Sequence, residues 1–314
     1  MKLPRFNHQN ILTADQFTKA DLAIVVETAT FMERSVRRRG RLDLLENKVM
    51  TALFYEPSSR TFGSFIAAMQ RLGGGFIPLQ GVTYSSVAKG ETLADTVRTF
   101  ASYSDVVVIR HPEVGSARLA AEFCDKPVIN AGDGVGEHPT QGLLDFYTIR
   151  QHFPNISGLT VTLVGDLLNG RTIHSLAKLL SLFRSVRLNL IAPEILKLPH
   201  DLKKRLTERG VTLVEKEQLE SVLPETQVLY ITRVQKERFT DLGTYEKLKH
   251  RYIITPDLIK KLPRDAIIMH PFPRVGEIAL GVDNDPRAVY ISEQMRNGMY
   301  VRMAILSLLL SKRV

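Results

Sequence analysis

The sequence contains one cysteine, Cys124, no tryptophan and no long apolar run. A single cysteine excludes an intramolecular disulfide framework and is typical of a reducing compartment, and Cys124 is expected to be a small buried thiol. A membrane-spanning helix needs about 18 or more consecutive apolar residues, and the opening MKLPRFNHQN has no apolar stretch suited to a secretory signal. These absences predict a cytoplasmic protein with no membrane partner.

Motifs for nucleotides, cofactors and metals are also missing. The phosphate loop G-x-x-x-x-G-K followed by Ser or Thr does not occur. LVGDLLNGRT follows an expected strand but lacks the G-x-G-x-x-G spacing of dinucleotide sites. No cluster of histidine, cysteine and carboxylate residues has the spacing of metal ligands. The sequence therefore predicts neither a metal nor any other cofactor.

Positive charge is in excess, because 42 lysines and arginines against 33 acidic residues give a net charge of +9. A basic protein can bind nucleic acid, an acidic membrane surface or small anions. The densest basic stretch, RSVRRRGR at residues 34–41, has no aromatic residues among its arginines, and no helix-turn-helix or zinc-finger spacing occurs. We interpret this stretch as a solvated helix end and expect no nucleic acid partner. The charge suits small, doubly anionic substrates.

Strand-like and helix-like patterns alternate along the 314 residues. Several expected strands are continuous apolar runs, which favours strands buried on both faces of a parallel sheet. The pattern predicts an α/β fold with right-handed crossovers. The expected strands span residues 48–56, 105–110, 126–132, 159–166, 186–193, 226–233 and 266–271.

The length allows one large or two ordinary domains. HPTQGLLDFYTIRQHF is typical of one helix, and the turn-rich PNISG follows it. We therefore expect two doubly wound parallel-sheet domains with a cleft between them. The expected bounds are 1–137 for the first domain, 138–153 for a linker helix, 154–286 for the second domain, and 287–314 for a C-terminal helix that packs back on the first.

Ligands of open α/β sheets bind beyond the carboxyl ends of the strands, and arginines recur at these ends. They are Arg60, Arg110, Arg171, Arg233 and Arg274. Polar loops at corresponding ends of two sheets favour one anion-binding cleft between two domains.

The stretch PSSRT, residues 57–61, lies where an expected strand passes into a helix. A helix N-terminus presents unpaired N–H groups and a partial positive charge. Serine and threonine hydroxyls add donors, and Arg60 adds a bidentate fork for oxyanions. This combination is suited to a phosphate group. A plain serine cap beside an exposed arginine is the alternative.

Seven segments of this chain together resemble aspartate carbamoyltransferase catalytic chains, within the aspartate/ornithine carbamoyltransferase superfamily. The segments are, in order, PSSRT, SSVAKGETLADT, RHPEVGSARLA, NAGDGVGEHPTQGLLD, VGDLLNGRTIHSLAKLL, TRVQKERF and MHPFPRVGEI. The resemblance implies transfer of the carbamoyl group from carbamoyl phosphate to the α-amine of L-aspartate, an early step of de novo pyrimidine (UMP) biosynthesis. It implies no cofactor.

The resemblance also implies the site residues. The implied catalytic residues are Arg60, Thr61, Arg110 and His138. Carbamoyl phosphate is expected to bind these four together with Ser58, Ser59, Gln141 and the backbone carbonyls of Phe272 and Pro273. The residues implied for aspartate are Lys89, Arg171, Arg233 and Gln235.

Assembly follows from the same resemblance. Ser85 and Lys89 match family residues that reach into the site of a neighbouring subunit. A homotrimer with shared active sites is therefore expected, and regulatory chains or other pathway enzymes stay open as further partners. Two positions depart from the family: Ser59 replaces a common threonine and Phe272 a common leucine. The hydroxyl and the backbone carbonyl that these positions supply are retained.

Two other functions stay open from the residues. Ornithine carbamoyltransferases share the phosphate turn and the His-Pro-x-Gln pattern, but they usually have His-Cys-Leu-Pro where this chain has HPFPR. They also need a site for a cationic side chain. A non-catalytic protein whose domains close on an anion is the second alternative, and the pair formed by His138 and Gln141 argues against it.

Overall fold

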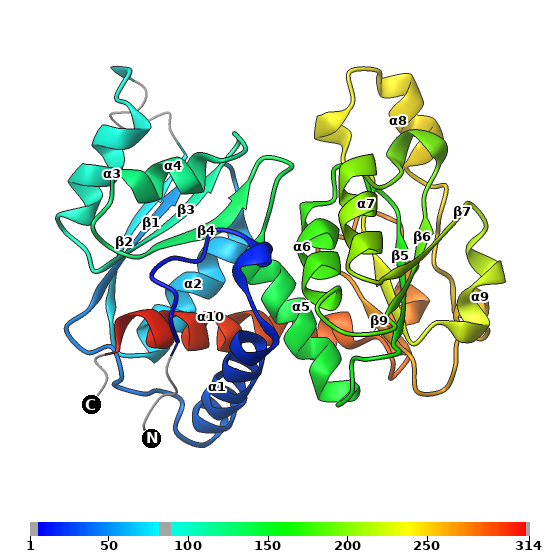
Figure 1. Cartoon of the computed structure of the whole chain (residues 1–314), viewed down its shortest axis with the longest axis horizontal. Coiled ribbons are helices and arrows are strands. Elements are labelled where there is room, and N and C mark those ends of the chain that lie inside the picture. Colours follow the sequence, from blue (N-terminus) through cyan, green and yellow to red (C-terminus); the bar gives the residue numbers. More distant parts are fainter. Residues whose placement is uncertain (1–5, 82–88, 312–314) are drawn as a thin grey trace. The chain divides into compact units, whose positions relative to one another are not determined.

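The computed structural model describes residues 6–81 and 89–311. The chain divides into two compact units: unit 1 is Met1–Tyr147 with Arg296–Val314, and unit 2 is Thr148–Met295. Each unit is built on one β-sheet with helices packed against it (Figure 1). The predicted architecture of two parallel-sheet α/β domains is confirmed, and the cleft between them stays a prediction.

Unit 1 contains a four-stranded sheet with the order β2-β1-β3-β4, in which all neighbours are parallel. The continuous apolar runs in its central strands made this pairing predictable. Its strands are β1 (Val49–Phe54), β2 (Gly75–Gln80), β3 (Val106–His111) and β4 (Val128–Asp133). Its helices are η1 (Ala14–Gln16), α1 (Lys19–Arg39), α2 (Ser59–Arg71), α3 (Leu93–Ala101), α4 (Ser116–Glu122) and α10 (Met295–Leu310).

Helices cover both faces of the sheet of unit 1. Successive side chains of a strand point to opposite faces, and Leu53, Val107 and Ile109 lie in one apolar cluster with side chains of α3 and α4. Figure 1 shows α3 and α4 on one side of this sheet and α2 and α10 on the other. The loops that carry the candidate site lie at the carboxyl ends of the strands.

Unit 2 contains a five-stranded parallel sheet with the order β7-β6-β5-β8-β9. Its strands are β5 (Thr160–Val164), β6 (Arg187–Ile191), β7 (Thr212–Lys216), β8 (Val228–Ile231) and β9 (Ile267–Met269). Its α-helices are α6 (Arg171–Leu180), α7 (His200–Glu208), α8 (Leu242–Leu248) and α9 (Pro256–Ile259). Its short helices are η3 (Glu194–Leu196), η4 (Leu219–Ser221), η5 (Leu223–Glu225), η6 (Lys236–Arg238), η7 (Leu280–Asn284) and η8 (Tyr290–Gln294).

Strands β2 and β7 were not predicted, and both are edge strands. All of their residues are exposed or half-buried, so neither forms a continuous apolar run. Pro78 lies within β2, where a missing N–H is tolerated because an edge strand has a free side. The seven predicted strands are the buried ones, in agreement with the signal on which their prediction rested.

Helix α5 (Pro139–His152) and helix α10 are buried over most of their surface. The division between the units falls inside α5, after Tyr147, and again before Arg296. The boundaries predicted from the sequence are at residues 138, 153 and 287. Hydropathy does not locate the division, since the helices carry apolar side chains all round. The buried apolar residues of α5 are Leu143, Leu144, Phe146, Tyr147 and Ile149.

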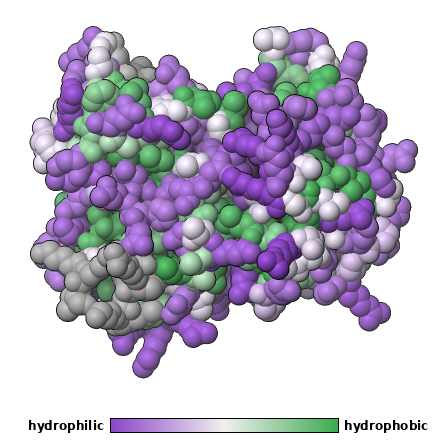
Figure 2. Space-filling model, viewed as in Figure 1, coloured by the Kyte–Doolittle hydropathy of each residue, from purple (hydrophilic) through white to green (hydrophobic). Residues whose placement is uncertain are grey.

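The surface in the view of Figure 2 is mostly hydrophilic, with apolar side chains in small groups. In the described part of the chain, no helix is both long and apolar enough to cross a membrane. Cys124 is half-buried rather than fully buried, and burial raises the pKa of its thiol. It lies against the apolar cluster under α3 and α4.

Candidate active site

The phosphate turn of unit 1 forms where β1 passes into α2. Ser58 is the N-cap residue of this 13-residue helix, but its side chain makes no capping hydrogen bond. Ser59 and Arg60 are exposed in the first turn, which carries no acidic residue. The plain serine cap that the sequence left open is therefore absent. The arrangement offers helix N–H groups, hydroxyls and a guanidinium to an anion.

Thr61 and His138 are brought together from α2 and from the start of α5. Thr61 Oγ1 lies 3.4 Å from His138 Nε2, and Thr140 Oγ1 lies 3.3 Å from His138 Nδ1. His138 is only 3% exposed, and Thr140 is fully buried. The imidazole is thus held on both ring nitrogens by hydroxyl groups in a site with little access to water.

Arg110 lies at the carboxyl end of β3, between β1 and β4. Its Nη1 donates to the carbonyl oxygen of Ala131 at 3.2 Å, and its Nη2 lies 3.1 Å from Glu56 Oε2. Both side chains of this ion pair are largely buried. Two separate contacts fix the plane of the guanidinium, so its remaining N–H groups have a set direction.

Gln141 lies in the first turn of α5 and is 9% exposed. Its Nε2 donates to Asp145 Oδ1 at 2.9 Å, and Asp145 is fully buried in the same helix. Asp145 is not among the residues predicted from the sequence. The spacing of four residues, which places two helical side chains side by side, is the signal that identifies it.

In unit 2, the carboxyl ends of β5 and β8 are tied together through polar side chains. Asn169 donates to Asp166 through its backbone at 2.9 Å and its side chain at 3.2 Å, and Gln235 Nε2 donates to the carbonyl oxygen of Asn169 at 2.9 Å. Burial raises the pKa of Asp166. Gly165 allows the backbone after β5 to lie close to the backbone after β8, since a Cβ at Gly165 would lie 2.1 Å from the carbonyl oxygen of Thr232.

The two predicted aspartate-binding arginines lie at neighbouring strand ends of unit 2. Arg171 is the first residue of α6, after β5, and Arg233 follows β8. Arg233 donates to Glu237 twice, through Nη1 at 3.0 Å and through Nη2. Burial disfavours the charge of Arg233, but the two hydrogen bonds to Glu237 outweigh it and raise the pKa of Arg233. The guanidinium is therefore a fixed, fully charged partner for a carboxylate.

The loop after β9 has a strained backbone at the predicted residue Phe272. Its φ is 54°, a value that favours glycine, and the peptide bond to Pro273 is cis. His270 Nδ1 accepts the N–H of Phe272 at 2.8 Å, and its Nε2 lies 2.6 Å from Glu277 Oε1. Because Nδ1 accepts, the proton is on Nε2 and the ring is neutral. Burial lowers the pKa of His270.

The two residues predicted to act in a neighbouring subunit lie between β2 and α3. Lys89 is exposed, three residues before Thr92, the N-cap of α3. Ser85 lies outside the described residues, so its predicted role stays a prediction. Among residues 6–81 and 89–311, no group of three histidine, cysteine or carboxylate side chains is arranged to hold a metal ion.

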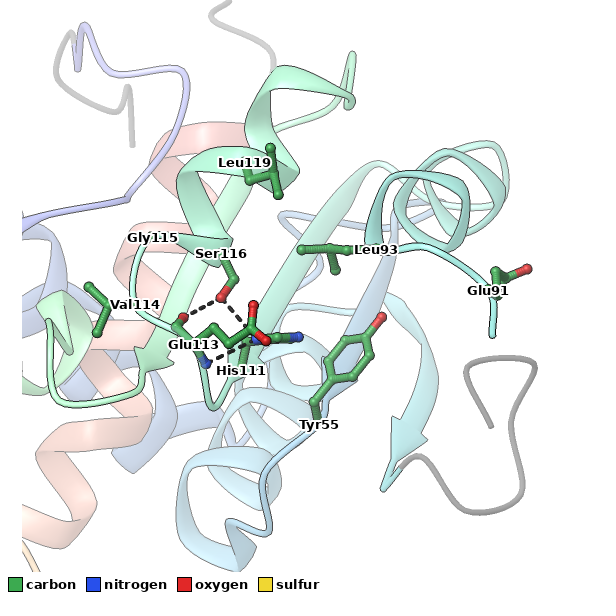
Figure 3. A pocket seen from close by; sticks show the side chains of 9 residues that line it. All are labelled: Tyr55, Glu91, Leu93, His111, Glu113, Val114, Gly115, Ser116 and Leu119. Atoms are coloured by element: carbon green, nitrogen blue, oxygen red, sulfur yellow. Dashed lines mark hydrogen bonds between the residues drawn. The ribbon is translucent and has the colours of Figure 1, made fainter. Parts of the chain in front are cut away.

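A pocket of about 410 Å³ opens on unit 1, beside the ends of β1 and β3 (Figure 3). The residues predicted to bind substrate do not line it. His111 Nδ1 accepts the N–H of Glu113 at 3.1 Å and lies 2.9 Å from Ser116 Oγ, while its ring lies 4.7 Å from that of Tyr55. Burial lowers the pKa of His111. These contacts hold the loop between β3 and α4.

Comparisons with known proteins show the family to which the chain belongs. The family description "Aspartate/ornithine carbamoyltransferase, carbamoyl-P binding domain" matches residues 9–151, and "Aspartate/ornithine carbamoyltransferase, Asp/Orn binding domain" matches residues 157–309. The chain belongs to the aspartate/ornithine carbamoyltransferase family. Within the family it is similar to aspartate carbamoyltransferases. The catalytic subunit from Thermoplasma acidophilum is 48% identical over 299 residues, which are 95% of this chain and 97% of that protein.

A solved structure and a longer relative extend this comparison. A crystal structure of aspartate transcarbamoylase from Trypanosoma cruzi in complex with carbamoyl phosphate has a TM-score of 0.93 and 42% identity, over 99% of this chain and 100% of that one. The multifunctional protein pyr1-3 of Dictyostelium discoideum is 51% identical over 300 residues. Those residues are 96% of this chain and 13% of that protein, so this chain spans a small part of that relative's length.

Proposed function

We propose that unit 1 binds carbamoyl phosphate and that unit 2 binds L-aspartate. The chain is an aspartate carbamoyltransferase: it transfers the carbamoyl group of carbamoyl phosphate to the α-amine of L-aspartate. The products are N-carbamoyl-L-aspartate and phosphate, in de novo pyrimidine biosynthesis. The structural observation that carries the residue assignment is the buried contact between Thr61 and His138. Thr61 lies in the first turn of α2, where the N-cap residue Ser58 makes no capping hydrogen bond.

The phosphate of carbamoyl phosphate binds at the N-terminus of α2. Ser58 and Ser59 supply hydroxyls there, and Arg60 supplies a guanidinium that stabilises the negative charge of the leaving group. The absence of acidic residues from this turn supports the assignment, since a carboxylate would repel the dianion. Positioning two anions in reacting geometry also lowers the entropic part of the barrier.

The carbonyl oxygen of carbamoyl phosphate gains negative charge when the neutral amine attacks. Thr61, Arg110 and His138 donate hydrogen bonds to it, as preorganised donors do in acyl transfer. The hydroxyl of Thr140 lies 3.3 Å from His138 Nδ1, and in the tautomer whose Nδ1 accepts from this hydroxyl, Nε2 carries the proton that faces the substrate. A carbon–nitrogen bond forms and the bond from the carbon to the bridging phosphate oxygen breaks. Phosphate, a base that the reaction itself releases, takes the amine proton.

The carbamoyl NH₂ group donates to Gln141 and to the backbone carbonyls of Phe272 and Pro273. The network around His270 supports the role of Phe272, because it holds the loop in a backbone conformation that otherwise costs free energy. The two carboxylates of aspartate bind cationic groups that are not assigned to carbamoyl phosphate. These are Lys89, Arg171 and Arg233, together with Gln235, whose side chain donates to the carbonyl oxygen of Asn169.

The test of this function is a colorimetric assay for carbamoyl-aspartate with the purified protein. A site that fixes two carboxylates with guanidinium groups rejects an ammonium side chain through charge repulsion and desolvation. We expect turnover with aspartate to exceed turnover with ornithine by at least about a hundredfold. Comparable turnover with ornithine would contradict the acceptor, and binding of both substrates without product would favour the non-catalytic alternative.

The proposed assembly is a homotrimer in which Lys89 completes the site of the next subunit. A heterologous interface of this kind closes by three-fold rotation, and the exposure of Lys89 in its own unit supports the proposal. Mixing Lys89→Ala with His138→Ala should restore activity, because some interfaces in a mixed trimer pair two intact residues. The unmixed variants should be nearly inactive. If mass measurements confirm subunit exchange and no activity returns, Lys89 acts within its own chain.

Location and further partners complete the proposal. We place the chain in the cytoplasm, which its single, half-buried cysteine supports. The names of two multifunctional relatives, pyr1-3 and the protein CAD of Squalus acanthias, support association with other enzymes of its pathway.

A further inference from the structure

The orientation of the Gln141 amide is determined by its partner. A glutamine amide has an oxygen that accepts and a nitrogen that donates, and the two ends are similar in shape. An ionised carboxylate only accepts, so the contact of 2.9 Å with Asp145 Oδ1 must come from the nitrogen. The amide oxygen of Gln141 is therefore turned away from Asp145.

The charge of Asp145 is balanced inside unit 1. Asp145 is fully buried, and a buried carboxylate without a compensating charge would take up a proton. Arg302 in α10 is 3% exposed, and its positive charge interacts favourably with Asp145. Burial lowers the pKa of Arg302 to about 10, which leaves it charged at neutral pH. A protonated Asp145 could donate a hydrogen bond to the amide oxygen of Gln141, so it would no longer select the amide nitrogen as its partner.

Residues of α2 and α10 surround the guanidinium of Arg302. Its guanidinium carbon lies 5.0 Å from the ring centre of Phe65 in α2, a cation–π distance. A Cβ at Gly298 would lie 2.6 Å from Arg302 Nη1, so a larger residue one turn earlier in α10 would shift the guanidinium from this position. Arg302 Nε makes no hydrogen bond within the described residues. Stacking on Phe65 and the charge of Asp145 both stabilise Arg302 at this position.

We propose that Asp145 is a positioning residue that presents the amide oxygen of Gln141 to the substrate. An oxygen so presented selects a ligand with an N–H donor, which is the carbamoyl NH₂ group. The inference rests on the proposed function, since it assigns Gln141 to carbamoyl phosphate. It predicts that Asp145 affects recognition of the carbamoyl group and leaves recognition of phosphate unchanged.

The main test replaces both buried charges together with Asp145→Leu/Arg302→Met. Removing a buried pair and restoring apolar packing avoids leaving one charge uncompensated. The KM for carbamoyl phosphate should rise about tenfold, as expected for the loss of one hydrogen bond. The inhibition constant of inorganic phosphate should stay within about twofold of the wild-type value, because the phosphate turn lies elsewhere. A purely structural defect would shift both constants together.

A double-mutant cycle decides whether Asp145 acts through Gln141. In a Gln141→Leu background, the paired substitution should cause no further rise in the KM for carbamoyl phosphate, since there is no amide left to orient. Additive effects would overturn the proposal, and so would an unchanged KM in the paired variant. Asp105→Asn is a control, because it neutralises a carboxylate of unit 1 that forms an ion pair with Lys48. It should change neither constant.

Asp145→Asn covers the case in which the paired variant does not fold. An asparagine can donate or accept, so it weakens the selection of one amide end without removing a buried partner. The KM for carbamoyl phosphate should rise at least about threefold with phosphate inhibition unchanged. If the KM does not move, or if this variant is also unfolded, Asp145 is a structural residue and the proposal is wrong. An inactive wild type would refute the proposed function itself.

Discussion

The two units hold their functional side chains in different ways. In unit 1, Thr61, His138 and Gln141 are each less than 10% exposed, and buried residues of the same unit fix them. In unit 2, Arg233 is about a quarter exposed and its partner Glu237 about half exposed. The first arrangement is suited to charge that develops during the reaction, and the second to binding a charge that is already present. Substitutions at residues of unit 1 that stabilise developing charge should therefore lower kcat, and substitutions at the carboxylate-binding residues of unit 2 should raise the KM for aspartate.

Arg60→Ala should produce the largest effect. If Arg60 stabilises the leaving phosphate, its loss should lower kcat by about a hundredfold or more, equivalent to ~2.7 kcal/mol or more. Steady-state rates at saturating concentrations of both substrates measure this. The fold should be retained, because Arg60 is exposed. Arg38→Ala, which removes an exposed arginine of α1, is the control. A near-normal kcat with only a raised KM would show that Arg60 binds substrate without assisting the chemistry.

Arg233→Ala should produce a smaller effect of a different kind. Hydrogen bonds to a charged group contribute about 1.5–3 kcal/mol, so the KM for aspartate should rise roughly ten- to hundredfold. The KM for carbamoyl phosphate should stay close to the wild-type value. Titrating each substrate at a saturating concentration of the other separates the two constants. If kcat falls and the KM for aspartate is unchanged, the contrast between the units is wrong.

The smallest effect concerns stability at mildly acidic pH. Burial lowers the folded-state pKa of both His270 and His111, and burial is more complete at His270. The neutral ring stabilises the fold above the unfolded-state pKa of about 6.5, and this stabilisation is lost as the pH falls below that value. The free energy of unfolding should decline by up to ~1.4 kcal/mol per pH unit for each such histidine. Urea unfolding between pH 7.5 and 5.5 measures the slope.

Two variants show which histidine causes the pH dependence of the unfolding free energy. His270→Gln should flatten the pH dependence of the unfolding free energy more than His111→Gln does, because His270 is 1% exposed and His111 is half-buried. The carboxylate of Glu277 does not interfere in this range. Burial alone would raise the pKa of Glu277, but hydrogen bonds that include the one from His270 hold it below its usual value. Equal slopes in the wild type and in His270→Gln would show that His270 takes up a proton over this range as readily in the folded protein as in the unfolded chain.

The sequence predicted those parts of the fold that depend on buried apolar runs. The seven predicted strands are present, whereas β2 and β7 were missed because all of their residues are exposed or half-buried, so neither contains a buried apolar run. The positions of Arg110 and Arg233 at strand ends were predictable because topology brings the carboxyl ends of parallel strands together. Asp145 and Arg302 were not, since each resembles an ordinary polar position of an apolar helix. Their pairing depends on how α5 and α10 pack, which no local pattern contains.

The order in which the units can be completed during synthesis follows from the position of α10. Unit 2 is one continuous segment, Thr148–Met295, and all of it leaves the ribosome before residues 296–311 do. Unit 1 needs those later residues, because Val301, Met303, Ala304, Ile305 and Leu306 are fully buried in its interior. The part of unit 1 that is translated first must therefore wait with an open apolar surface while unit 2 folds. That interval is the stage at which the nascent chain most needs protection from aggregation.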